Sequence, residues 1–115
     1  MSLEVRDRDE LAPIFAALGD QTRLGLVAQL AAREPMSITR LTVGTDITRQ
    51  AVTRHLEVLA DAGLVHATHR GRERLWELDE SGLEPARRFL THVSEWWDEK
   101  LADLKASLEE QPAQS

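Results

Sequence analysis

Four side chains gathered at one place in the chain have the chemistry to recognise nucleic acid. They are Arg49, Gln50, Thr53 and Arg54. On an α-helix this spacing places them on one face, opposite the apolar positions. Guanidinium, amide and hydroxyl groups form hydrogen bonds with base edges and phosphates when a helix lies in the major groove. The alternative is an ordinary amphipathic surface helix whose exposed face is rich in arginine.

The element that positions these groups is expected to be a helix over residues 48–62. Its apolar residues fall in one stripe, spaced by four and three, and they are Val52, Leu56 and Leu59. We expect Thr48 to cap the N-terminus, because its hydroxyl can accept a hydrogen bond from a free amide of the first turn. Gly63 follows the last periodic residue, where a left-handed C-terminal cap requires glycine.

A short helix and a turn are expected before this helix. Residues 37–43 are rich in threonine, so their helix propensity is weak and packing of Ile38 and Leu41 must hold them. In the turn 44–46 a glycine usually takes a positive φ, and Asp46 tolerates that conformation less well. The turn is therefore the weakest part of the pattern.

Two further helices are expected towards the N-terminus. The first covers about residues 9–18, with Pro13 near its start and Gly19 at its end. The second covers residues 21–32, and we expect Asp20 to cap it. The residues of the second helix that share an apolar face are Leu24, Val27 and Leu30.

A β-hairpin is expected directly after the helix over residues 48–62. Two strand-like runs, residues 64–69 and 74–78, flank residues 70–73 (RGRE), in which Gly71 supplies the turn. The apolar side chains that attach the hairpin to the helices are Leu64, Ala67, Leu75 and Leu78. Arginines at a hairpin tip suit contacts with phosphates or the minor groove. The alternative is a solvated hairpin whose charges protect its edges.

The charge of the chain is unevenly distributed. The whole sequence carries a formal charge of −6, which on its own argues against a nucleic-acid partner. Residues 35–76 nevertheless hold six arginines against four acidic residues, a net +2, whereas residues 1–34 and 77–115 carry −2 and −6. Because only the local potential matters within about one Debye length, an acidic body with a basic face is compatible with DNA binding.

Length and composition fit a single domain over residues 1–115. The sequence has no cysteine, so it offers no disulfide, thiolate metal site or thiol nucleophile, which favours a cytoplasmic protein. No apolar run approaches the roughly 20 residues of a membrane span, and the N-terminus has no apolar signal core. The sequence contains no phosphate-binding loop or catalytic motif, so we expect neither enzyme activity nor a cofactor.

The C-terminal part of the chain is expected to form a long helix over residues 84–110. Its apolar stripe, spaced by three and four residues, is Leu90, Val93, Trp97, Leu101, Leu104 and Leu108. A small domain cannot cover such a helix of about 39 Å, and an exposed stripe would be a large apolar patch. A second copy of the chain across a two-fold axis is the economical partner. The residues of the first helix expected to join this interface are Leu11, Ile14 and Phe15.

Three segments of the chain together resemble a known family: FAALGDQTRLGLVAQL, ITRQAVTRHLEVLADAGLV and GRERLWEL. They are similar to the ArsR-type (arsenic-repressor-like) winged helix-turn-helix regulators of bacteria, over about residues 11–110. The most specific part is T-x-x-x-V-T-x-H-L-x-x-L, followed by A-G-L-V and the G-R-x-R wing. The resemblance implies a mainly α fold with a small β-hairpin, the wing (residues 64–78), between the fourth helix and the last. It also implies a homodimeric repressor that binds an inverted-repeat operator in double-stranded DNA and releases it on a signal.

Residue chemistry and the resemblance together assign the contacts with DNA. The candidate DNA-contacting residues are Thr48, Arg49, Gln50, Thr53, Arg54, His55, Arg70, Arg72 and Arg74. The chain departs from the family pattern at Asp46, where the turn often has glycine, and at Gly44, where alanine is common. Thiol-based members place cysteines on the short helix before the turn, and this chain has none.

The signal and the function class leave alternatives open. Other family members sense metals through Asp, His and Glu ligands on the last helix, and here the candidates are His92 and Glu95. The acid-x-histidine pair that normally completes such a site is missing, so our expectation is no metal site. An unidentified small molecule bound between the terminal helices is another candidate signal. The alternative function is a winged-helix adaptor whose basic face docks an acidic protein.

Overall fold

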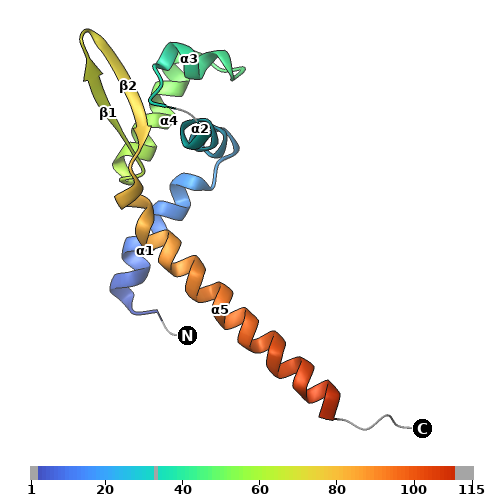
Figure 1. Cartoon of the computed structure of the whole chain (residues 1–115). Coiled ribbons are helices and arrows are strands. Elements are labelled where there is room, and N and C mark those ends of the chain that lie inside the picture. Colours follow the sequence, from blue (N-terminus) through green and yellow to red (C-terminus); the bar gives the residue numbers. More distant parts are fainter. Residues whose placement is uncertain (1–2, 33, 111–115) are drawn as a thin grey trace.

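The computed structural model describes residues 3–32 and 34–110, which form five helices and one β-hairpin (Figure 1). In chain order the elements are α1 (Val5–Leu18), α2 (Gln21–Ala32), α3 (Ile38–Val43), α4 (Arg49–Asp61), β1 (Val65–Arg70), β2 (Glu73–Leu78) and α5 (Glu80–Glu110). The two strands are antiparallel, with Val65 opposite Leu78. This architecture confirms the predicted fold class. None of the described helices is both long and apolar enough to cross a membrane.

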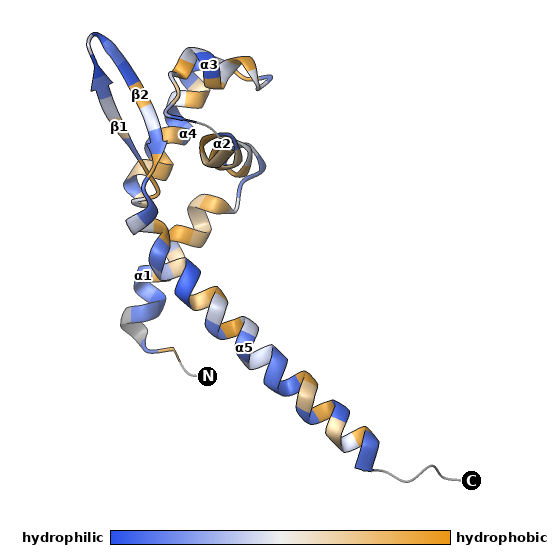
Figure 2. Cartoon of the chain, viewed as in Figure 1, coloured by the Kyte–Doolittle hydropathy of each residue, from blue (hydrophilic) through white to orange (hydrophobic). Residues whose placement is uncertain are grey.

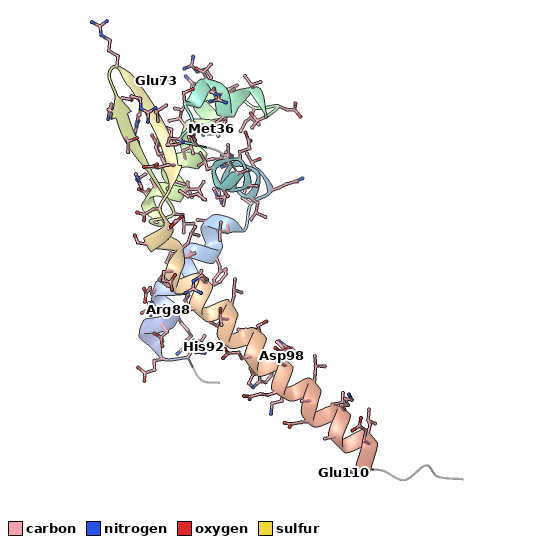
Figure 3. The ribbon with its side chains drawn as sticks, viewed as in Figure 1. Met36, Glu73, Arg88, His92, Asp98 and Glu110 are labelled. Carbon is pink, nitrogen blue, oxygen red and sulfur yellow. The ribbon has the colours of Figure 1, made fainter. Side chains whose placement is uncertain are left out.

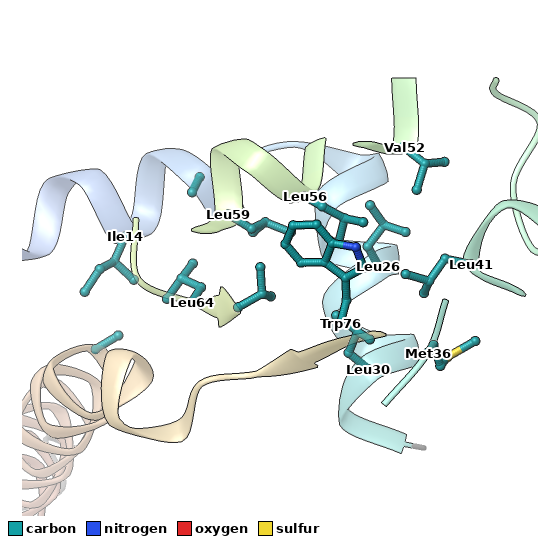
Figure 4. Close-up of a cluster of buried hydrophobic side chains, with 13 residues drawn as sticks. Ile14, Leu26, Leu30, Met36, Leu41, Val52, Leu56, Leu59, Leu64 and Trp76 are labelled. Atoms are coloured by element: carbon teal, nitrogen blue, oxygen red, sulfur yellow. The ribbon is translucent and has the colours of Figure 1, made fainter. Parts of the chain in front are cut away.

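The core lies where the first four helices meet the base of the hairpin (Figure 4). Val52, Leu56 and Leu59 of α4 are completely buried in it, as their spacing predicts. Trp76 of β2 is only 1% exposed and belongs to the same cluster. Full burial of a large apolar side chain stabilises a fold by about 1.5–3 kcal/mol. This burial fixes which face of α4 points to solvent.

A short antiparallel bridge joins the hairpin to the segment before α3. The Met36 amide donates to the Trp76 carbonyl at 2.9 Å, and the Trp76 amide donates to the Met36 carbonyl at 2.8 Å. Both side chains are buried, although the sequence analysis predicted neither residue as part of the core. Since α3 begins two residues after Met36, the bridge sets the position of the hairpin relative to α3.

The helix ends follow the capping residues that the sequence indicates. The Asp20 carboxylate accepts a hydrogen bond from the Arg23 amide at 3.0 Å. This hydrogen bond lowers the pKa of Asp20, because it stabilises the ionised carboxylate. The Thr48 hydroxyl accepts from the Ala51 amide at 3.1 Å. Gly63 follows α4 with a φ of +79°, the left-handed conformation predicted for it.

The turn between α3 and α4 differs from the prediction. Gly44 has a φ of −87°, and among the described residues none other than glycine has a positive φ. The amide and the hydroxyl of Thr45 both donate to the carbonyl of Thr42 at 3.0 Å, and these bonds close the turn. Asp46 therefore carries no backbone strain, and the expectation of a left-handed residue here is wrong.

Both terminal helices begin four residues earlier than the sequence predicts. At α5 the reason is Asp79, whose carboxylate accepts hydrogen bonds from the amides of Ser81 and Gly82 at 3.1 and 3.3 Å. The hydroxyl of Ser81 also donates to it, and that bond is the main reason why the pKa of Asp79 is lowered. This cap starts the helix ahead of Pro85, which lies inside it. At α1 the acidic Asp7 lies in the first turn. A carboxylate there interacts favourably with the positive end of the helix dipole, which favours the earlier start.

The buried face of α2 also differs from the expected one. Leu26 and Leu30 are buried, whereas Leu24 is 52% exposed and Val27 is half-buried. Both stripes have helical spacing, so periodicity alone could not choose between them. The predicted core position of Leu24 is therefore wrong.

The first helix packs against the start of α5. Phe15 contacts Phe89 edge to face, with ring centres 5.8 Å apart. Leu11 and Ile14 are 8% and 4% exposed in the single chain, so almost no surface of either remains for a second copy. Both side chains support the packing of the protomer itself, and their place at a dimer interface stays a prediction. Of the three α1 residues, Phe15 alone keeps partial exposure.

The C-terminal half of α5 extends away from the rest of the chain (Figure 1). Every described residue from Trp97 to Glu110 is exposed. Hydrophobic positions nevertheless recur along the whole helix (Figure 2). The predicted apolar stripe is therefore present on a helix that the body of the chain does not cover.

The start of α5 lies directly on the backbone that follows α4. A Cβ added at Gly82 would lie 1.6 Å from the carbonyl oxygen of Gly63. Gly82→Ala therefore forces two backbones apart, and we expect it to lower the free energy of unfolding by about 1–3 kcal/mol. The matched control is Gly25→Ala in α2, where the added methyl meets nothing and should stabilise the helix by about 0.5–1 kcal/mol. Urea denaturation at one protein concentration measures both, and an unchanged Gly82→Ala variant contradicts the close contact.

Candidate nucleic-acid interface

The predicted hydrogen-bonding residues of α4 lie on the side away from the core. Arg49, Gln50 and Arg54 are exposed, and Thr53 is half-exposed. A shallow hollow of about 350 Å³ is lined by Ile38, Arg49, Gln50, Thr53, Arg54 and Glu57. The structure therefore brings the four side chains together on one accessible surface.

Two threonine hydroxyls on this surface are already engaged in α4. The Thr53 hydroxyl donates to the Arg49 carbonyl at 2.9 Å, so Thr53 can offer a ligand only its oxygen lone pairs. The Thr48 oxygen accepts from the Ala51 amide in the N-terminal cap, which leaves the hydroxyl hydrogen of Thr48 free to donate. The two residues therefore present opposite hydrogen-bonding characters to a partner.

His55 is half-buried and forms contacts within the fold, so its role in DNA binding stays a prediction. Its Nδ1 atom lies 3.2 Å from an Arg23 guanidinium nitrogen and 3.9 Å from an Asp20 carboxylate oxygen. The Arg23 Nε donates to the carbonyl of Ala17 at 2.6 Å. Because a guanidinium group only donates, Nδ1 of His55 is the acceptor in this contact. His55 thus ties α4 to the corner between α1 and α2.

The hairpin presents different side chains on its two faces. Arg74 and Trp76 are two residues apart in β2, so both lie on the face that packs on the helices. The Arg74 guanidinium carbon stacks 4.5 Å from the centre of the Trp76 ring. Arg70 lies on the other face, directly opposite Glu73, whose carboxylate partly offsets its charge. The predicted wing arginines therefore do not share one face.

The tip of the hairpin is formed by Gly71 and Arg72. Gly71 has a φ of +65°, as the predicted turn requires. Arg72 is exposed beside it. Figure 3 shows Glu73 near this tip and Met36 beside the middle of the hairpin. Residues 70–74 are all exposed, so the tip projects beyond the buried part of the structure.

The sequence matches known regulators over the helices just described. Residues 18–67 match a family model described as a helix-turn-helix domain. The HTH-type transcriptional regulator YuzN of Bacillus subtilis (strain 168) is 41% identical over 68 residues, which cover 54% of this chain and 74% of the relative. The HTH-type transcriptional regulator Rv2034 of Mycobacterium tuberculosis is 35% identical over 87 residues, which cover 76% of this chain and 78% of the relative.

Solved structures resemble nearly the whole chain. An ArsR-like transcriptional regulator from Rhodococcus sp. RHA1 has a TM-score of 0.73 and 33% identity, and the match covers 93% of this chain and 100% of that one. A possible transcriptional regulator for arsenical resistance has a TM-score of 0.61 and 30% identity, and covers 80% of this chain and 92% of its own. This chain belongs to the ArsR family. It is a winged helix-turn-helix transcriptional regulator, in a family of DNA-binding proteins and not of enzymes.

Two charged residues at the surface of this ArsR-family protein were missed by the sequence analysis. Glu57 lies on the exposed face of α4, and its position one turn beyond Thr53 could have revealed it. Arg40 of α3 is exposed and lines a groove with the wing arginines Arg72 and Arg74. Because α3 and the wing approach each other only in the fold, local spacing gave no signal for Arg40.

The structure gives little support to a metal ion or a small molecule as the signal. His92 Nδ1 and Glu95 Oε2 are 3.9 Å apart on the exposed surface of α5. Within residues 3–32 and 34–110, no three His, Asp or Glu side chains form a group that could hold a metal. A hollow of about 370 Å³ lies between α1 and α5, with Arg88 and His92 (Figure 3) in its lining. This is the space in which the predicted small molecule would lie.

The N-terminal cap of α4 gives a direct test of how this surface is held. Thr48→Ala leaves the Ala51 amide without its acceptor, and we expect the free energy of unfolding to fall by about 1 kcal/mol. Thr48→Ser keeps the accepting oxygen and is the matched control, with an expected change of only a few tenths of a kcal/mol. Urea denaturation followed by circular dichroism compares them. Equal losses in both variants contradict the capping role.

Proposed function

We propose that this ArsR-family protein is a homodimeric repressor that binds an inverted-repeat operator through α4 and the wing. The observation that carries the proposal is the exposed cationic face of α4 opposite a fully buried apolar stripe. This helix lies in residues 35–76, the segment of the chain with a net positive charge. A helix held firmly by its back face can enter a major groove without rearranging. The direction of regulation, repression, follows from the family resemblance.

The side chains of the interface divide by their chemistry. We assign base reading to Arg49, Gln50 and Thr53, since a glutamine amide pairs with adenine and a guanidinium with guanine. Arg54 and the wing arginines are assigned to phosphates and the minor groove, where contacts position the protein on the duplex. The free hydroxyl hydrogen of Thr48 suits a phosphate oxygen at the start of α4.

The exposed stripe of α5 supports the proposed dimer. Five of its side chains are exposed in the single chain, with 54–61% of their surface accessible. They are Leu90, Trp97, Leu101, Leu104 and Leu108. An apolar surface of this length on an otherwise polar helix needs a partner. A solved winged helix-turn-helix domain, Mb0332 from Mycobacterium bovis, is described as homodimeric, and it shares the fold with 22% identity and a TM-score of 0.62.

Charges beside the stripe favour antiparallel pairing of two α5 helices. Residues 90, 97 and 104 recur every seven residues, as do residues 101 and 108, so the stripe has the spacing of a coiled coil. In a parallel pair Lys100 would face the partner subunit's Lys105 across the seam, twice by symmetry. Antiparallel pairing avoids this repulsion. It also relates the two winged bodies by a two-fold axis, which is the symmetry of an inverted repeat.

Selection of duplexes from a random pool, followed by fluorescence anisotropy, tests the proposed DNA reading. The expected product is an inverted repeat whose half-sites are centred about one helical turn apart. Gln50→Ala should change the preferred base at one position of each half-site and weaken the original site by about 1–3 kcal/mol for each half-site. Gln21→Ala, an exposed glutamine of α2, is the control. Failure of the pool to converge on any sequence contradicts the proposal and favours the adaptor alternative.

Sedimentation equilibrium tests the proposed dimer. The double variant Trp97→Asp and Leu101→Asp puts charges into the apolar stripe, so we expect the mass of a monomer, 12.9 kDa, in place of twice that value. Ala106→Asp adds one such charge to α5 outside the stripe and should leave the dimer intact. A dimeric mass for the double variant removes α5 as the interface.

A further inference from the structure

A basic groove runs between the wing and α3, beside the exposed face of α4. Its volume is about 520 Å³, and it is lined by Ser37, Ile38, Thr39, Arg40, Arg49, Arg72, Glu73 and Arg74. The lining therefore has four arginines and a single carboxylate. Among the salt bridges of the described residues, none involves these four arginines. The fold therefore gathers positive charge here that its own salt bridges do not neutralise.

The walls of the groove are held at a fixed separation. One wall starts at Ser37, directly after Met36, and the other includes Arg74, two residues before Trp76. The paired hydrogen bonds between Met36 and Trp76, at 2.8 and 2.9 Å, join the two walls at their base. The Arg74 guanidinium is itself stacked on the buried Trp76 ring and so loses little freedom when it binds a ligand.

The chemistry of the groove suits a row of phosphates. Guanidinium groups bind phosphate oxygens through paired, charge-assisted hydrogen bonds. Four of them along one groove exceed the needs of a single small anion, whereas a nucleic-acid strand presents a charge at every nucleotide. Arg49 lines both this groove and the hollow on the exposed face of α4, so the two surfaces are continuous. A strand of the duplex that α4 reads would pass along the groove.

We propose that this groove binds the sugar–phosphate backbone of one DNA strand, and that Arg40 of α3 is a phosphate ligand in it. The inference rests on the proposed function and extends the interface to α3, where the sequence predicted no contact. Arg40 adds affinity for every sequence and no base preference, because phosphates carry no sequence information. Glu73 lies at the edge of the groove and limits how closely the strand approaches the tip of the wing.

The salt dependence of binding tests this role of Arg40. The full-length protein is titrated by fluorescence anisotropy with the selected duplex and with a scrambled duplex of equal length and composition. Because the proposed dimer has one Arg40 in each half-site, we expect Arg40→Gln to lower the slope of log Kd against log salt by about two units. Affinity for both duplexes should weaken about three- to tenfold for each half-site. Arg40→Lys should restore most of the slope. Arg8→Gln, an exposed arginine of α1, should match the wild type.

Neutral phosphates locate the contact on the DNA. Single methylphosphonate substitutions remove one backbone charge at a time from the selected duplex. At one position in each half-site the substitution should weaken the wild type but not Arg40→Gln, because the variant has already lost that contact. A wild-type slope in Arg40→Gln, with specific binding intact, overturns the groove assignment alone. Absence of specific binding by the wild-type protein overturns the proposed function, and this inference with it.

Discussion

The pair of backbone hydrogen bonds between Met36 and Trp76 is the constraint on which the proposed DNA-binding surface depends. It ties the hairpin to the segment that leads into α3, and both residues bury their side chains beside the apolar face of α4. An isolated pair of strands is marginally stable in water, so the hairpin depends on this bridge together with the buried side chains of its strands. With this anchor, the exposed face of α4, the groove and the wing form one surface of fixed shape. Binding then costs little ordering of the protein.

The charge distribution explains how an anionic chain can serve as a DNA-binding regulator. The wing and the helices of the helix-turn-helix carry the positive charge, whereas the long α5 helix and the N-terminal segment carry the negative charge. In Figure 1 the wing and the C-terminal end of α5 lie at opposite ends of the chain. Because screening in physiological salt acts over about 8 Å, the acids of distal α5 hardly affect phosphates at the wing. They instead discourage attachment to DNA by any other face.

Sequence patterns were sufficient where one local rule decides the structure. The apolar spacing of α4, the caps at Asp20 and Thr48, and the left-handed Gly63 all appear as predicted. The buried face of α2 was misjudged because two stripes fit the same period and only packing chooses between them. The early start of α5 was missed because Asp79 outweighs the boundary that Pro85 indicates.

The candidate nucleic-acid interface was predictable only where local spacing decides the structure. Residues on one helix reveal their common face by spacing, so the exposed side of α4 could be drawn from the sequence. The contacts of His55 within the fold could not be predicted, because its partners Arg23 and Asp20 are distant in sequence and come close only in the fold. The separation of Arg70 from Arg74 depends on strand register, and the position of Arg40 depends on the bridge at Trp76.

Site-directed cleavage of DNA gives the most direct test that α4 and the wing form the reading surface of a symmetric dimer. The chain has no cysteine, so Glu57→Cys, Glu73→Cys or Asp103→Cys can carry a single tethered iron chelate without disturbing an assigned contact. On the selected duplex each chelate is predicted to give two symmetric sets of cuts about one helical turn apart. The cuts from position 57 should lie in the major groove, and those from position 73 should lie beside that groove. Cleavage from position 103 on α5, with none from position 57, would contradict this prediction.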